Sequence, residues 1–217
     1  MQTYTRLLTA SIAFSAALAG SARADSILDR IAAEVLAAKF GIKTAEVARV
    51  RTASGLSMFD VAPIFSASSY GRTRADTVWQ LRRQGLGWGQ VAHRIGMHPG
   101  TFNKLRVAGA FDSGRIWSRT LGSRFAVPES RVRAVLGRGA SPQDSIAAIL
   151  IAKATHRSPQ AVFDEYRGGR DWERIRIKYK VDFGNWRKVA KNPPPHRQIA
   201  QSSPRGKTKV HPIKPRG

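Results

Sequence analysis

The chain has 217 residues, with 37 lysines and arginines against 14 aspartates and glutamates, and a formal net charge of +23 at pH 7. Arginine supplies 26 of the 37 basic residues. Because its planar guanidinium matches phosphate, the composition favours a polyanionic partner. A genome that uses arginine freely is the alternative explanation. The absence of cysteine excludes disulfides, thiolate metal sites and cysteine nucleophiles.

The first 24 residues have the pattern of a secretory signal peptide. Arg6 precedes an apolar run over residues 7–20, and residues 22–24 (Ala-Arg-Ala) form a small-x-small cleavage motif. The run is too short to span a bilayer, and no second apolar run follows. The sequence therefore predicts a secreted protein, extracellular or periplasmic, with no membrane span after cleavage. An apolar first helix of the fold is the alternative, but that helix would lack an amphipathic face.

Capping residues and apolar stripes divide the following chain into short predicted helices. Pro63 shortens or kinks one of them, and several glycines make residues 107–125 less regular. No run of alternating β-branched residues predicts a strand. The expected fold class is all-α. The expected helices cover residues 26–40, 44–53, 57–65, 74–84, two within 85–106, 128–136, one beginning at 141, 158–166, 171–180 and 184–191.

The stretch 85–106, GLGWGQVAHRIGMHPGTFNKLR, predicts two helices joined by a tight turn. Ala92 suits a close helix crossing, Gly96 a turn at positive φ, and Phe102 a position that locks the second helix. This spacing resembles the helix-turn-helix of DNA-binding proteins, whose second helix enters the major groove. The alternative is an ordinary helical hairpin with a solvated polar face. The resemblance implies Thr101, Asn103, Lys104 and Arg106 as contacts to bases and phosphates.

The chain also predicts an internal duplication. A shift of 84 residues places Gly85 on Gly169 and Trp88 on Trp172, and each copy contains two related halves. The predicted divisions are a signal peptide over 1–24, repeat modules over 25–107 and 108–191, and a tail over 192–217. The body is therefore expected to consist of duplicated short-helix repeats resembling helix-turn-helix units.

The second copy departs from the first at its turn. Arg176 replaces Ala92 and Lys180 replaces Gly96, so we expect a strained turn and a loss of groove-reading geometry. Residues 101–191 nevertheless hold nineteen basic and eight acidic residues, against ten and six in residues 25–100. Charge-driven contacts to phosphate are predicted for Arg174, Lys178, Lys180, Asn185, Arg187 and Lys188.

Residues 192–217 differ in composition from the rest. They contain six prolines, six basic residues and no acidic residue, which predicts a disordered basic tail. Such a tail adds non-specific attraction to a polyanion, and a solubilising tail is the alternative. The tail residues expected to contact phosphate are Arg197, Arg205, Lys207 and Lys209.

No residue pattern nominates an enzyme. The five histidines form no HExxH pair, the carboxylates are scattered, and no glycine-rich loop follows a strand. The sequence predicts no catalytic residue, no metal site and no cofactor.

Gly85–Ala92, with the sequence GLGWGQVA, belongs to Ser-Pro-led units that follow an export signal. This arrangement resembles uncharacterised secreted bacterial helical-repeat proteins, a resemblance that covers most of residues 39–191 and implies no activity. We therefore expect a secreted protein that binds or coats extracellular duplex DNA through arginine and lysine contacts to phosphate. Several protomers assembled along the polymer form a further hypothesis. The alternative is a periplasmic or cell-surface scaffold that binds an anionic envelope polymer.

Overall fold

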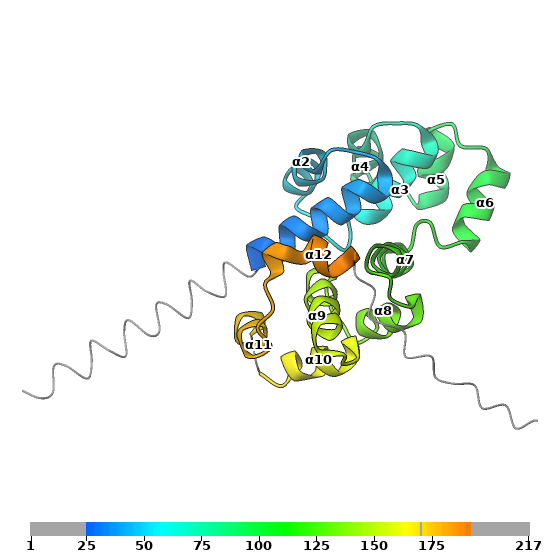
Figure 1. The fold of residues 1–217 in the computed structure, drawn as a ribbon. Coiled ribbons are helices and arrows are strands. Elements are labelled where there is room, and N and C mark those ends of the chain that lie inside the picture. Colours follow the sequence, from blue (N-terminus) through cyan, green and yellow to red (C-terminus); the bar gives the residue numbers. More distant parts are fainter. Residues whose placement is uncertain (1–24, 170, 192–217) are drawn as a thin grey trace, which may run out of the picture.

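The computed structural model describes residues 25–169 and 171–191, which form helices joined by short turns with no strand among them (Figure 1). The predicted all-α fold is confirmed. Within these ranges, no helix is both long and apolar enough to cross a membrane. In chain order the elements are a helix over 25–40, α2 (Thr44–Ser54), α3 (Ala62–Gly71), α4 (Ala75–Arg83), α5 (Trp88–Arg94), α6 (Pro99–Val107), α7 (Ser113–Phe125), α8 (Glu129–Leu136), α9 (Pro142–Thr155), α10 (Pro159–Arg167), α11 (Trp172–Lys178), the 3₁₀ turn η1 (Phe183–Asn185) and α12 (Trp186–Lys191).

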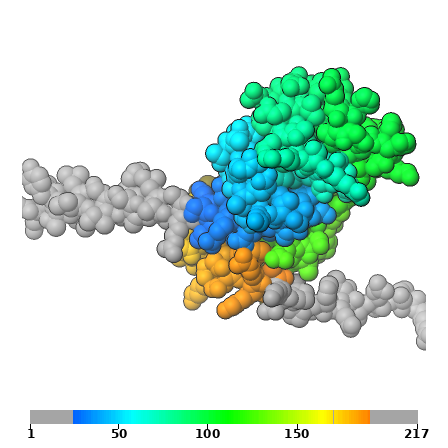
Figure 2. Space-filling view, turned by 90° about the horizontal axis from the view of Figure 1, so that it is seen from above, coloured from blue at the N-terminus to red at the C-terminus, as the bar shows by residue number. Residues whose placement is uncertain are grey.

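One hydrophobic core runs through both halves of the chain. Helix α9 is buried on almost every side between Ser145 and Ala152, which accounts for its continuous apolar sequence. Trp117 of α7 is fully buried, and its indole N–H donates to the carbonyl of Met58 at 3.2 Å. The helix over 25–40 and α12 lie side by side (Figures 1 and 2), so the first and last helices of the described chain are in contact.

The backbone repeats a unit smaller than the predicted module. In the described chain, six pairs of helices share one connection, in which a residue at positive φ and two linking residues precede the second helix. We call each pair a hairpin unit. The units join the helix 25–40 to α2, α3 to α4, α5 to α6, α7 to α8, α9 to α10, and α11 to η1 and α12. Their positive-φ residues are Gly41, Arg72, Gly96, Ala126, His156 and Lys180.

The same backbone hydrogen bond closes all six turns. The amide after the positive-φ residue donates to the carbonyl five residues before it, with N···O distances of 2.9–3.2 Å. This bond is typical of the Schellman motif, which satisfies a carbonyl at the end of a helix. Six residues after each positive-φ residue, the second helix carries an apolar side chain. These side chains are Val47, Val78, Phe102, Val132, Val162 and Trp186, and all except Phe102 are at most 2% exposed.

The predicted duplication is confirmed at the level of secondary structure. The positive-φ residues of the first three units recur in the last three units at shifts of 85, 84 and 84 residues. Helices α4 and α5 begin 84 residues before α10 and α11. The first copy thus comprises three hairpin units and the second copy another three. The predicted module boundary after residue 107 coincides with the end of α6.

The second copy keeps the architecture of the turn, with the predicted strain at Lys180, a residue other than glycine at positive φ. Lys180 adopts φ 54°, and the amide of Val181 donates to the carbonyl of Arg176 at 2.9 Å, as Met97 does to Ala92 at 2.9 Å in the first copy. The Arg176 side chain extends along the surface to Glu173 instead of entering the helix crossing. A long side chain is therefore tolerated because it turns back along α11 to Glu173.

We expect the two turns to respond in opposite directions to exchanged residues. A Cβ at Gly96 meets no atom within 4 Å, so Gly96→Lys costs only backbone strain, about 1 kcal/mol of unfolding free energy. Lys180→Gly stabilises by less than that, since glycine loses more conformational entropy on folding. Urea unfolding measures both, with Lys180→Ala as a control that keeps the strain and leaves stability unchanged. A Lys180→Gly variant as unstable as Gly96→Lys contradicts the assignment of strain.

The prediction of an irregular segment over 107–125 is wrong from Ser113 onward. Residues Ser113–Phe125 form one regular helix, α7, capped by the Asp112 carboxylate, which accepts from the amide of Arg115 at 2.7 Å. Gly122 lies inside α7, where an added Cβ would lie 2.9 Å from the carbonyl oxygen of Val127. This glycine permits close packing of α7 on the chain before α8 and does not interrupt the helix.

Candidate nucleic-acid interface

Helix α6 is the second helix of the third hairpin unit, and none of its residues is buried. It lies at the outer edge of the molecule, far from the helix 25–40 and from α12, and is drawn in green (Figures 1 and 2). The four predicted contact residues Thr101, Asn103, Lys104 and Arg106 are all exposed. Neither Lys104 nor Arg106 forms an ion pair with an acidic residue of the described chain. The structure therefore brings these four residues together on one projecting helix.

Aromatic packing holds α6 in place. The Phe102 ring lies 5.3 Å from the Phe111 ring, which stacks in turn on Trp88 at 5.5 Å. The Arg82 guanidinium covers the outer face of Trp88 at 4.6 Å. At the start of α6, His98 Nδ1 accepts from the amide of Gly100 at 3.1 Å. Offset ring contacts of this kind stabilise by about 0.5–1.5 kcal/mol each, so α6 is positioned by a small satellite cluster.

The equivalent helix of the second copy occupies a different environment. Trp186 of α12 is 2% exposed and packs 5.9 Å from the Phe125 ring, while α12 contacts α7 and α9 of the core. The Lys153 ammonium donates to the carbonyl of Ala190 near the end of α12 at 3.3 Å. The two copies share a turn, but only the first presents its second helix away from the core.

In the second copy, acidic residues already bind several of the side chains that were predicted to contact phosphate. Arg174 lies 3.4 Å from Asp171, and Arg187 lies 2.6 Å from Glu34, which is 153 residues away in the chain. Asn185 donates to Asp182 at 2.6 Å. Lys180 and Lys188 are exposed. The second copy is richer in basic residues, as its sequence indicates, but a phosphate there has to compete with carboxylates for part of them.

Glu165 binds Lys178, the remaining predicted contact of the second copy. Its carboxylate binds Arg157 at 2.7 Å and Lys178 at 2.8 Å, and it accepts from the Tyr179 hydroxyl at 2.8 Å. The hydrogen bonds from Arg157 and then Lys178 lower the pKa of Glu165 to about 2. The carboxylate therefore stays ionised at neutral pH and holds Lys178 against the protein.

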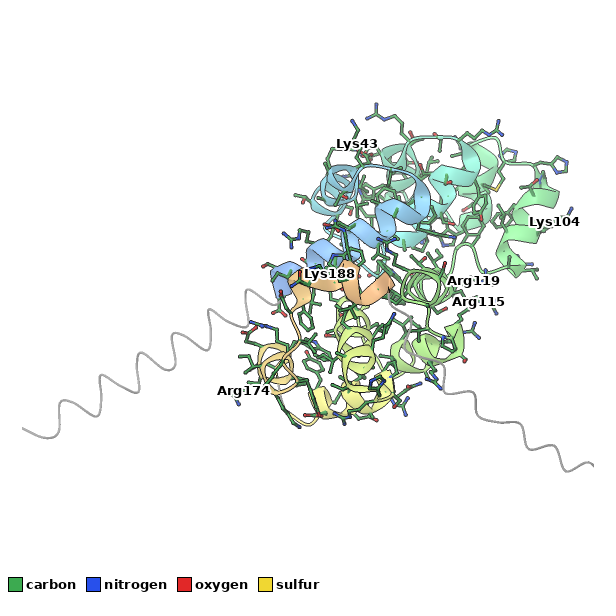
Figure 3. The ribbon with its side chains drawn as sticks, viewed as in Figure 1. Lys43, Lys104, Arg115, Arg119, Arg174 and Lys188 are labelled. Carbon is green, nitrogen blue, oxygen red and sulfur yellow. The ribbon has the colours of Figure 1, made fainter. Side chains whose placement is uncertain are left out.

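Two arginines outside the predicted set lie beside α6. Arg115 donates to the carbonyl of Val107 at 3.1 Å, and Arg119 donates to the carbonyl of Ala108 at 2.7 Å. These carbonyls end α6, where the helix dipole is negative. Figure 3 shows Arg115 and Arg119 on α7, on the same side of the molecule as Lys104. Their four-residue spacing indicates one face of a helix. This spacing was not recognised in the sequence because no regular helix was predicted over residues 107–125.

The predicted tail contacts Arg197, Arg205, Lys207 and Lys209 lie outside the described residues, as does the predicted signal peptide. Within the described ranges, no group of three or more histidine, aspartate or glutamate side chains is placed to hold a metal ion.

The described chain is thus an all-helical repeat protein with one projecting basic helix. Comparison with models of known protein families, with curated protein sequences and with solved structures found no significant match. The helical-repeat character therefore stands on the six shared turns alone.

Proposed function

We propose that this is a secreted nucleic-acid-binding protein that binds or coats extracellular duplex DNA through arginine and lysine contacts to phosphate. The observation that carries the proposal is the exposure of Thr101, Asn103, Lys104 and Arg106 on the projecting second helix of a hairpin unit. The high net charge supports a polyanion, and the signal-peptide pattern supports a ligand outside the cytoplasm. Phosphate contacts of this kind bind DNA with little dependence on base sequence.

The shared turn supports a helix-turn-helix mode of docking for α6. In that mode the second helix lies in the major groove and the first crosses the backbone. The Asn103 amide has a donor and an acceptor that can read a base edge. The Arg106 guanidinium has donors for a base edge or a phosphate, and Thr101 and Lys104 suit phosphates. The repetition of the unit supports an assembly of several protomers along one duplex.

A titration of the exported protein with duplex DNA tests the proposal. The protein is purified from the secreted fraction, where a first residue of Asp25 is the expected sign of export and cleavage. We expect gel retardation at low salt that weakens steeply as salt rises. The double variant Lys104→Ala/Arg106→Ala removes two phosphate contacts and should bind about 30-fold more weakly at 0.15 M salt, from roughly fivefold per contact.

The control is Lys39→Gln/Lys43→Gln, which removes the same charge from two exposed residues near the start of α2. Figure 3 shows Lys43 far from Lys104, so this variant should bind like the unaltered protein. No retardation at low salt contradicts DNA binding. Retention by an anionic polysaccharide that DNA fails to displace supports the rival function, a scaffold bound to an envelope polymer.

A further inference from the structure

We propose that the phosphate-binding surface continues from α6 across α7 to α8 as a basic strip formed by Lys104, Arg106, Arg115, Arg119 and Arg133. This inference rests on the proposed function and adds three residues from two helices that the sequence did not nominate. The strip commits to the backbone of duplex DNA as its ligand, because its members are guanidinium and ammonium groups spread over a surface and not gathered in a pocket.

Hydrogen bonds from arginines of α7 to the last carbonyls of α6 join the two helices of the strip. Arg106 directly precedes Val107, whose carbonyl accepts from Arg115 at 3.1 Å. Arg119 follows Arg115 by four residues on α7, so the two side chains share one face of that helix, about 6 Å apart along its axis. Each arginine of α7 is thus anchored to the end of α6 and keeps further N–H donors for a ligand.

Glu129, the first residue of α8, extends the series to the next helix. Its carboxylate lies 3.7 Å from Arg119 and also pairs with Arg133, and it accepts from the Ser118 hydroxyl at 3.2 Å. Burial raises its pKa, but the hydrogen bonds from Arg133 and Ser118 outweigh burial and lower the pKa below its ordinary value. One ionised carboxylate therefore serves two arginines whose side chains stay 49% and 59% exposed.

The charge balance of this surface differs from the rest of the molecule. Between residues 99 and 136 the chain has seven basic and two acidic residues, and one of these, Asp112, caps α7. Arginines four residues apart on one helix repel each other. The carbonyls that end α6 relieve this repulsion only partly, because a carbonyl carries a partial charge. A phosphate bridging the strip adds negative charge to the single carboxylate of Glu129, which Arg119 and Arg133 share.

The test compares the salt dependence of four double variants of the purified protein, with duplex DNA as the probe, and one of them is Lys104→Ala/Arg106→Ala. Arg115→Gln/Arg119→Gln removes two charges and keeps an amide donor on each side chain. We expect the slope of log K against log salt to become shallower by about 1.8, at about 0.9 for each phosphate that is no longer neutralised. Arg115→Lys/Arg119→Lys keeps the charge and should restore most of the slope. Lys39→Gln/Lys43→Gln should leave the slope unchanged.

The outcomes separate this inference from the proposed function. If the glutamine variant keeps the full slope while Lys104→Ala/Arg106→Ala loses it, DNA binds α6 and the strip is wrong. If the lysine variant loses as much slope as the glutamine variant, with both folded by circular dichroism, the arginines act by placing α6 and the strip is again wrong. If the unaltered protein does not bind DNA, the proposed function fails and the strip with it.

Discussion

Trp117→Ala is expected to destabilise the protein by about 3–5 kcal/mol, a large fraction of the 5–15 kcal/mol typical of a folded domain. The indole is fully buried in α7 and donates to the carbonyl of Met58 in the first half of the chain. Its removal opens a cavity and leaves that carbonyl without its partner. Urea unfolding followed by circular dichroism at 222 nm measures the loss.

The same measurement tests whether the two copies fold together. Because one core spans both, the variant should unfold in a single transition that is shifted to lower urea. Tyr70→Ala is the matched control, since Tyr70 is 53% exposed and its removal should change stability by no more than about 0.5 kcal/mol. Two separate transitions, or a loss below about 1 kcal/mol for Trp117→Ala, contradict a shared core.

Trp186→Ala and Phe102→Ala should differ strongly although both residues occupy the same position of the repeat. Trp186 is 2% exposed and packs on Phe125, so we expect a loss of about 3–5 kcal/mol. Phe102 is only partly buried, against Phe111 in the satellite cluster, so we expect a loss of about 1–2 kcal/mol. Thermal or urea unfolding of the two variants provides the comparison.

The difference bears on function because it measures how firmly each second helix is held. A weakly held α6 unfolds locally at low cost, as is common for elements that bind ligands. Val107→Ala is a useful control on α6, since Val107 is 72% exposed and its loss should be nearly neutral. Equal losses for Trp186→Ala and Phe102→Ala would show that α6 is held as firmly as α12.

The sequence predicted the turn at Gly96 in detail, and related units in each copy only by their spacing, whereas the described chain has six such turns. The turn at Gly96 was recognised because glycine adopts positive φ without strain. Gly41 provides the same signal, but the other four turns use Arg72, Ala126, His156 and Lys180. These residues adopt positive φ only because tertiary packing outweighs a local cost of about 1 kcal/mol each. A sequence pattern based on glycine therefore identifies the turns without backbone strain and misses those that tertiary packing has to stabilise.

The candidate site was predicted only in part for a similar reason. Lys104 and Arg106 were recognised because they lie near a recognised turn. Arg115 and Arg119 were missed because their relation to α6 depends on how α7 packs beside it. The pairing of Arg187 with Glu34 spans 153 residues, and no local pattern indicates it.

By itself, the sequence determined the all-α class, the duplication at 84–85 residues and most helix boundaries, because periodicity and capping act over a few residues. Only the tertiary structure decided that α12 is docked on the core while α6, at the same place in the repeat, projects from it. The physical reason is that burial depends on which other helices cover a surface. Phe125 and α9 cover Trp186, whereas the small cluster of Phe111 and Trp88 supports α6.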